Sequence, residues 1–121
     1  MKEFSFSTPI VDSLKFEKSD KYVDTNDYQV EIKINKSQVY NTNDKEYYYG
    51  IKIVISGAEV PFGLEMQISA IFAVELDEGE SVQEILEDKG TGILISYARP
   101  IIADLTLRSG LAPFNMPFIN V

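Results

Sequence analysis

The chain of 121 residues contains no cysteine and no histidine. Without cysteine it can form no disulfide, thiol nucleophile or zinc–thiolate site, and without histidine it lacks the commonest general base and metal ligand. Neighbouring acids such as Asp77 and Glu78 stand in no pattern that marks acid–base chemistry, and the acidic run 75–88 lacks the spacing of a calcium-binding EF-hand. We therefore expect a protein that is not an enzyme and that uses no cofactor and no metal.

Long apolar runs and an excess of positive charge are also missing. No stretch approaches the roughly 18 apolar residues that cross a bilayer, and the opening MKEFSFSTPI lacks the apolar segment and cleavage site of a signal peptide. The formal net charge is −8, whereas binding to nucleic acid or to an anionic membrane rests on Lys and Arg. We expect no nucleic-acid partner, no membrane insertion and a cytoplasmic location.

Three segments in the middle of the chain alternate apolar and polar residues with a period of two, which is typical of half-buried β-strands. They are YQVEIKIN (28–35), YYYGIKIVIS (47–56) and LEMQISAIFAVEL (64–76). A less regular first strand begins with EFSFS, is interrupted at Pro9, and resumes with Leu14 and Phe16. Short polar or glycine-bearing connections between these segments suit hairpins. The pattern predicts a four-stranded antiparallel meander.

Helical patterns occur only near the end of the chain. Ser81 and Glu84 form a capping box at the start of a short helix, which Gly90 is expected to end. A longer helix is predicted from Thr91 to Ser109, and Gly110 is its stop signal. Its apolar stripe consists of Leu94, Tyr97, Ala98, Ile101, Ile102 and Leu105. Pro100 lies inside this helix and predicts a kink or a division into two segments.

Together these elements predict an α+β fold, in which a C-terminal amphipathic helix packs on one face of the four-stranded sheet. Hydrophobic residues make up 45% of the chain, and the length suits a single domain over residues 1–121. One helix covers only part of one sheet face. The apolar ending LAPFNMPFINV (111–121) adds further apolar surface, so we expect the chain to form a homo-oligomer.

Two apolar clusters admit both a structural and a functional interpretation. The alternating rows that contain Ile32 and Ile53 either form the sheet core under the helix or floor a groove that binds another chain. Tyr47, Tyr48 and Tyr49 are consecutive, so at least one of them lies on the opposite sheet face, near solvent or an interface. Aromatic side chains suit contact with varied peptides because they offer a large area at low entropic cost.

The C-terminal stretch ILISYARPIIADLTLRSGLAPFNMPFINV (93–121) resembles the SecB family of protein-export chaperones. The matching features are Tyr97-Ala98-Arg99, the helix sequence IIADLT (101–106), and Asn120 near the end. The order of the strands upstream agrees as well, so that the resemblance covers nearly the whole chain, although its specific motif covers only the last quarter.

The resemblance implies an ATP-independent holdase that binds unfolded preproteins in long grooves of a homo-oligomer, a dimer or a tetramer, and passes them to the SecA motor ATPase. In FGLEMQISAIF (62–72) and DSLKFEK (12–18), the family's acidic docking positions correspond to Glu65 and Glu17. The subunit-contact candidates are Tyr97, Arg99, Ile101 and Leu105. The groove candidates are Val30, Ile32, Ile34, Tyr47, Tyr49, Ile51, Ile53, Phe114 and Met116.

The sequence departs from the family pattern at several positions. Ser96 stands where a proline is usual, and Pro100 where a charged residue is usual. The sequence ends at Val121, where family members usually continue into a further helix and an acidic tail that helps bind SecA. Two other interpretations therefore stay open: a SecB-like chaperone dedicated to one partner, of the toxin–antitoxin or mobile-element type, and a self-assembling structural subunit.

Overall fold

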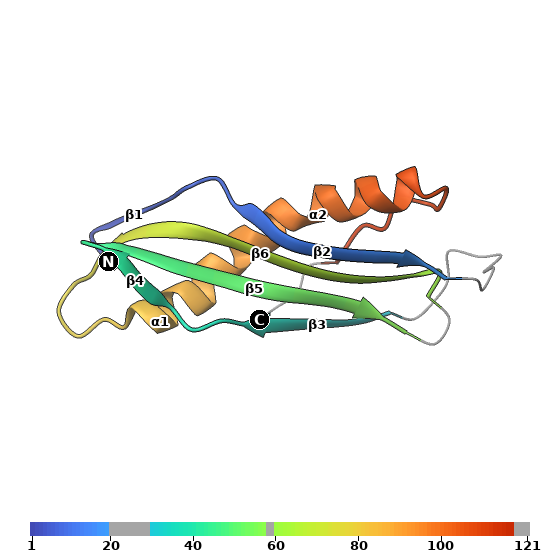
Figure 1. The fold of residues 1–121 in the computed structure, drawn as a ribbon. Helices are drawn as coiled ribbons and strands as arrows, with labels where there is room; N and C mark the ends of the chain where they lie inside the picture. Colours follow the sequence, from blue (N-terminus) through green and yellow to red (C-terminus); the bar gives the residue numbers. More distant parts are fainter. Residues whose placement is uncertain (20–29, 58–59, 118–121) are drawn as a thin grey trace.

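A computed structural model describes residues 1–19, 30–57 and 60–117, and shows one sheet with a long helical segment lying across one of its faces (Figure 1). The strands are β1 (Glu3–Phe6), β2 (Ile10–Lys18), β3 (Glu31–Lys36), β4 (Tyr40–Asn43), β5 (Glu46–Ser56) and β6 (Phe62–Glu75). The helices are α1 (Val82–Ile85), the π-helix η1 (Leu86–Gly90) and α2 (Thr91–Arg108). The α+β plan, with one helix packed on an antiparallel sheet, is confirmed.

The prediction of four strands is wrong, because the described sheet has six. β1 and β2 follow one another along one edge of β6, and β4 and β3 share the far edge of β5, with every pairing antiparallel. The first break lies at Pro9, which has no backbone N–H to donate. The second lies at Ser37, whose hydroxyl accepts from the Gly50 N–H at 3.0 Å in place of a strand carbonyl. The sheet is thus four strands wide, and each of its two edges consists of two shorter strands.

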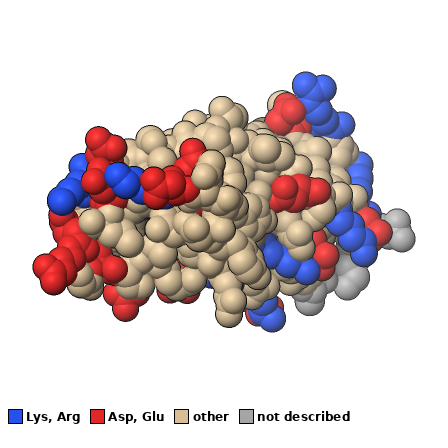
Figure 2. Space-filling model, turned by 60° about the vertical axis from the view of Figure 1, so that its left-hand side comes forward, with Lys and Arg blue, Asp and Glu red and all other residues tan. Residues whose placement is uncertain are grey.

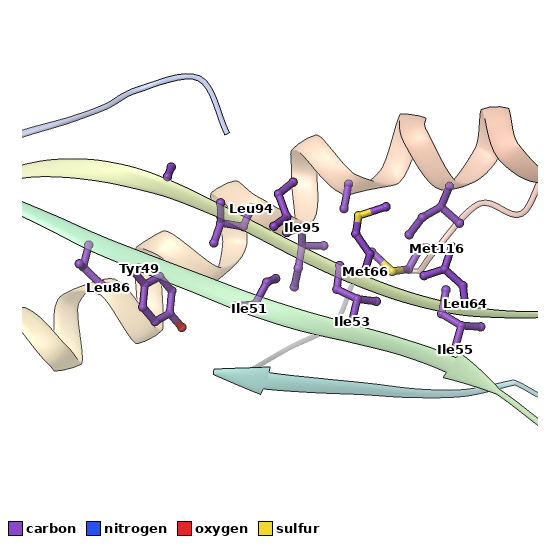
Figure 3. Close-up of a cluster of buried hydrophobic side chains, with 14 of the residues drawn as sticks. Tyr49, Ile51, Ile53, Ile55, Leu64, Met66, Leu86, Leu94, Ile95 and Met116 are labelled. Atoms are coloured by element: carbon purple, nitrogen blue, oxygen red, sulfur yellow. The ribbon is translucent and has the colours of Figure 1, made fainter. Parts of the chain in front are cut away.

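The predicted alternation is confirmed in the two central strands. In their register Ile53 lies opposite Met66, and Tyr49 lies opposite Ala70, so one face of both strands points toward the helix. Side chains on that face are at most 4% exposed: Tyr49, Ile51, Ile53, Ile55, Leu64, Met66, Ile68, Ala70, Phe72 and Val74. Figure 3 shows several of them meeting Leu94 and Ile95 between the sheet and the helix. The core therefore lies between β5, β6 and α2.

The helical segment begins where the sequence predicts and continues past its predicted interruption. The Glu84 N–H donates to the Ser81 hydroxyl at 3.4 Å, as in a capping box. Gly90 was expected to end the first helix, but its φ and ψ of −65° and −41° are helical, and the chain runs on into α2. A Cβ at Gly90 would lie 3.1 Å from Cδ2 of Tyr49. This glycine lets the helix approach the sheet closely, and it does not stop the helix.

The end of α2 agrees with the sequence, and Pro100 does not divide it. Gly110 adopts a φ of +84°, the left-handed conformation that ends a helix. Helix α2 is one element from Thr91 to Arg108 with Pro100 inside it. Both Pro100 and Ser96 are exposed, so the Ser96 carbonyl that loses its helical donor can bond to water. A division into two segments at Pro100 is therefore not observed.

The apolar segment after α2 folds back onto the helix that precedes it. Thr106, which is fully buried, accepts the Leu111 N–H at its carbonyl (3.0 Å) and the Phe114 N–H at its hydroxyl (2.8 Å). The Phe114 ring meets Phe62 edge-on at 5.4 Å, and Met116 is buried in the core. Part of the apolar ending is thus core of this chain. Residues 118–121 lie outside the described part.

Candidate functional site: an apolar strip between β1 and α2

The predicted groove residues divide into two groups in the structure. Tyr49, Ile51 and Ile53 lie in the core beneath α2, where no surface of this chain exposes them. The Tyr49 hydroxyl bonds to the Thr91 hydroxyl at 2.6 Å, and burial raises the pKa of this phenol. These side chains hold the helix on the sheet, and a bound segment could reach them only if the helix moved away.

The second group lies at the rim of the sheet. Ile32 pairs with Ile55 and Ile34 with Ile53, so that both face the helix side of the sheet from its outer strand β3, where they are half-buried. Val30, Tyr47 and Phe114 are likewise half-buried, and Met116 is buried. Ile32 and Ile34 therefore lie on the helix side of the sheet, and the tertiary structure leaves them partly open.

Two exposed aromatic residues on the helix side were not among the predicted groove residues. Phe6 is 38% exposed and Tyr97 is 43% exposed, and their rings meet edge-on at 6.1 Å. Phe4 and Phe6 both pack against the Phe72 ring, and Ile93 lies one helical turn before Tyr97. We name Phe4, Phe6, Ile93 and Tyr97 the β1–α2 strip. The EFSFS alternation could have indicated it, because it places two phenylalanines on one face.

A hollow of about 580 Å³ adjoins this strip. Its walls come from the start of the chain with β1 and from η1 and the first half of α2, and it is lined by Met1, Phe4, Asp88, Lys89, Gly92, Ile93, Ile95, Ser96 and Arg99. A Cβ at Gly92 would meet nothing within 4 Å, so the helix backbone is open there. The hollow is therefore a groove with an apolar floor and a few charged side chains on its rim.

The four predicted subunit-contact residues lie along α2 in different environments. Tyr97 belongs to the strip, and Arg99, half-buried, lines the hollow. Ile101 and Leu105 follow one and two turns after Tyr97 and are half-buried. The structure thus brings the first two together at the groove and leaves the other two further along the same helix.

The predicted docking acids lie together on the opposite, helix-free face. Glu17 and Glu65 line a shallow hollow of about 200 Å³ with Lys15 and Gly63. Lys15 lies opposite Glu65 in the register, and the Lys52 ammonium lies 4.0 Å from the Glu65 carboxylate. Near the two acids this face also carries Lys15, Lys33, Lys52 and Glu31, and Asp12 lies further along β2. The two acids share a site, but their surroundings are balanced in charge.

Acidic side chains gather at one end of the molecule (Figure 2). This acidic end contains the start of β1, the β4–β5 hairpin, the end of β6 and the α1–η1 turns (Figure 1). Its charged residues in the described part are Glu3, Asp44, Glu46, Glu75, Asp77, Glu78, Glu80, Glu84, Glu87 and Asp88 with Lys2, Lys45 and Lys89. The Met1 ammonium pairs with Asp77 and Glu80 and holds the pKa of Glu80 below its usual value.

Two kinds of feature are absent from the described residues. No helix among them is long and apolar enough to cross a membrane. No group of acidic side chains in residues 1–19, 30–57 and 60–117 is arranged to hold a metal ion. The features that remain for function are the β1–α2 strip with its groove, the two docking acids and the acidic end.

Comparison with solved structures shows the same fold. A SecB-like chaperone of Mycobacterium tuberculosis, solved in complex with a peptide from an antitoxin, superimposes with a TM-score of 0.77 at 16% identity, over 97% of this chain and 90% of that chain. A protein of unknown function from Streptococcus agalactiae gives a TM-score of 0.59 at 14% identity, over 96% of this chain and 98% of that one.

Sequence comparison identifies the family. A protein-export protein SecB of Saccharophagus degradans is 31% identical over 88 residues, which cover 69% of this chain and 52% of the relative. A SecB of Xanthomonas campestris is 22% identical over 123 residues, covering 99% and 68%. The chain thus spans about half the length of the first of these relatives. The family model for preprotein translocase subunit SecB matches residues 1–121, and the chain belongs to the SecB family.

Proposed function

We propose that this chain is a holdase, a chaperone that binds unfolded apolar segments without ATP, cofactor or metal. The observation that carries the proposal is the β1–α2 strip, where the aromatic rings of Phe6 and Tyr97 stay exposed beside a groove of about 580 Å³. Burying such rings contributes roughly 25 cal/mol per Å² of apolar area, less the cost of ordering the bound segment. Membership of the SecB family supports the same function.

The strip also lies beside an open strand edge. β1 pairs with β6 along one side, and no other described strand pairs with it along the other. The free backbone groups of an edge strand can bond to an extended peptide whatever its sequence. A segment that pairs with β1 would place alternate side chains over the apolar strip, which suits the binding of many different clients.

The test is suppression of aggregation of a chemically denatured protein by a stoichiometric amount of this chain. We expect protection by the wild type and a marked loss of protection with Phe6→Ser combined with Tyr97→Ser. Ile10→Ser is the matched control, because Ile10 is 63% exposed but pairs with Ser69 on the opposite sheet face. If the wild type fails to slow aggregation, the chain is not a holdase, and the self-assembling subunit becomes the better explanation.

We propose further that the chain forms a homo-oligomer, in which Tyr97, Arg99, Ile101 and Leu105 are subunit contacts. The support is that these residues follow one another along α2 and that none is in the core. Tyr97 and Arg99 adjoin the groove, so they contact a second subunit only while no client is bound. Native mass of the wild type and of Leu105→Ser and Tyr97→Ser separates the roles, since a subunit contact lowers the oligomer mass when it is removed.

For the export pathway, we propose that the chain delivers clients in the cytoplasm to SecA through Glu17 and Glu65. The support is that both acids line one hollow on the flat, helix-free face. Glu17→Gln with Glu65→Gln should weaken SecA binding in calorimetry, while Glu3→Gln with Glu46→Gln, at the acidic end, should not. Unchanged SecA affinity in the first pair would contradict this role.

A second candidate function is that of a chaperone dedicated to one partner, with no coupling to SecA. Two observations favour it: the similar fold of a SecB-like chaperone that was solved with an antitoxin peptide, and the balanced charge around Glu65. A pull-down of this chain with SecA and with a panel of unfolded proteins distinguishes the two functions. Capture of clients without SecA favours the dedicated chaperone.

A further inference from the structure

The groove and the acidic end meet at the first turns of the helical segment. Asp88 lines the groove, and Asp77 and Glu80 lie at its Met1 end, where they pair with the Met1 ammonium. Glu84, one turn before Asp88, and Glu78 in the preceding loop are both exposed. A segment that leaves the groove in this direction therefore passes over Asp77, Glu78, Glu80, Glu84 and Asp88, whereas Glu3, Glu46 and Glu75 of the acidic end face the helix-free side of the sheet.

The other end of the helix has the opposite character. Arg108 lies in the last turn of α2, and the Lys18 ammonium lies 3.8 Å from the place where a Cβ on Gly110 would be. Asp104 pairs with Arg108 at 2.7 Å, so the net charge here is slightly positive. The surface thus changes sign along the length of α2, from acidic at its beginning to weakly basic at its end.

We propose that the β1–α2 groove holds an extended client segment in one orientation, with its apolar residues in the groove and its Lys- or Arg-bearing end over the acidic end. This inference rests on the proposed holdase function and adds a direction to it. Charge complementarity supports this orientation, because a basic flank is attracted at one end of the groove and repelled at the other.

The charges on the groove rim sharpen this placement. Lys89 and Arg99 line the hollow itself, so a basic side chain of the client is disfavoured inside it. The hollow accommodates apolar side chains against Phe4 and Ile93, and the basic flank lies beyond Asp88, toward Glu78 and Glu84. The acids at the helix start also complement the helix dipole, but that role leaves their charge exposed to a client.

Photo-crosslinking measures the orientation directly. One peptide carries an aromatic apolar stretch with a lysine cluster at one end, and a photoreactive residue stands next to the cluster or at the far end. A photoreactive residue beside the lysines should crosslink to residues 75–88 of the protein. A photoreactive residue at the far end of the peptide should crosslink to residues 101–111. Moving the lysine cluster to the other terminus of the peptide should preserve this map, since the charge and not the chain direction sets it.

Affinity measurements with charge variants complete the test. Glu78→Lys with Glu84→Lys should weaken binding of the lysine-flanked peptide about tenfold at low salt, the sum expected for a few exposed charge pairs. Glu31→Lys with Asn35→Lys and Gln38→Lys makes the same change in net charge at exposed positions away from the groove and should leave the affinity within about twofold. An uncharged peptide with the same apolar stretch should bind all three proteins alike.

The possible failures are distinct from one another. If the uncharged apolar peptide does not bind at all, the holdase function is wrong. If both peptides bind equally well, with crosslinks from either end spread over both regions, the holdase function stands and the fixed orientation is wrong. If peptide binding is absent and native mass shows that Phe6→Ser dissociates a dimer, a second copy occupies the groove, which overturns the inference.

Discussion

The helix side of the sheet has two parts that are built from the same kinds of residue but differ in what covers them. Phe72 and Tyr49, in the central strands, are fully buried beneath α2. Phe6 packs on the same Phe72 ring from the edge strand β1, yet its outer side remains exposed. The alternation of the strands decides which face a side chain occupies, but the path of the helix decides whether that side chain is covered.

The path of the helix explains this difference. Its beginning lies near the β4 edge, where the Val39 N–H donates to the Gln83 side chain at 2.9 Å, and its end lies near β2, where Gly110 approaches Lys18. The helix therefore crosses the strands obliquely (Figure 1). An oblique helix covers the centre of the sheet and leaves a corner open beside β1, and that corner is the β1–α2 strip.

The largest expected effect contrasts two phenylalanines in contact with each other. Phe72→Ala should lower the free energy of unfolding by about 3–5 kcal/mol, because it removes a fully buried ring and leaves a cavity. Phe6→Ala should cost about 1 kcal/mol, because its ring is already partly in water. Urea unfolding measures both. Equal losses would mean that the strip is as well covered as the core, for example by a second subunit.

Two glycines one half-turn apart in the helix provide the next contrast. Gly90→Val should destabilise the protein by about 1–3 kcal/mol, because its side chain would overlap the Tyr49 ring. Gly92→Ala should stabilise it by about 0.5–1 kcal/mol, because the site is open and alanine favours helix. Thermal unfolding tests the pair. A destabilising Gly92→Ala would show that another chain packs against this backbone.

The buried phenol of Tyr49 gives a pH-dependent test of the core. Its pKa in the folded state is raised above 10 by burial, so the unfolded state loses the proton first as the pH rises. The contribution of this phenol to the free energy of unfolding should therefore be fully present below about pH 10 and should be lost as the pH rises above it. Tyr49→Phe should make this alkaline loss shallower in urea titrations at successive pH values. An identical alkaline profile would mean that this phenol is accessible to water in the folded protein.

The smallest expected change in stability belongs to the strip itself. Tyr97→Ser should change the free energy of unfolding by less than about 1 kcal/mol, since the ring is largely exposed. It should nevertheless reduce the fluorescence of ANS, a dye that binds exposed apolar surface, more than Ile10→Ser does. A large loss of stability with unchanged dye binding would place Tyr97 in an interface and not on an open surface.

The comparison also shows which features of the fold could be predicted from the sequence. The period of two placed Ile32, Ile34 and Ile53 on the helix side correctly, because alternation is a local property of a strand. Ser81 and Gly110 marked the helix ends correctly for the same reason, since caps depend on a few neighbouring residues. The family resemblance was confirmed over the whole chain.

The sequence by itself thus determined the class of fold, the inward faces of the strands and the outer limits of the helical segment. Only the tertiary structure decided that Gly90 is a close contact with Tyr49, that Ile53 is core, and that Phe6 is open. The physical reason is that these outcomes depend on the oblique path of the helix over strands far away in the sequence. Local patterns carry no information about that path.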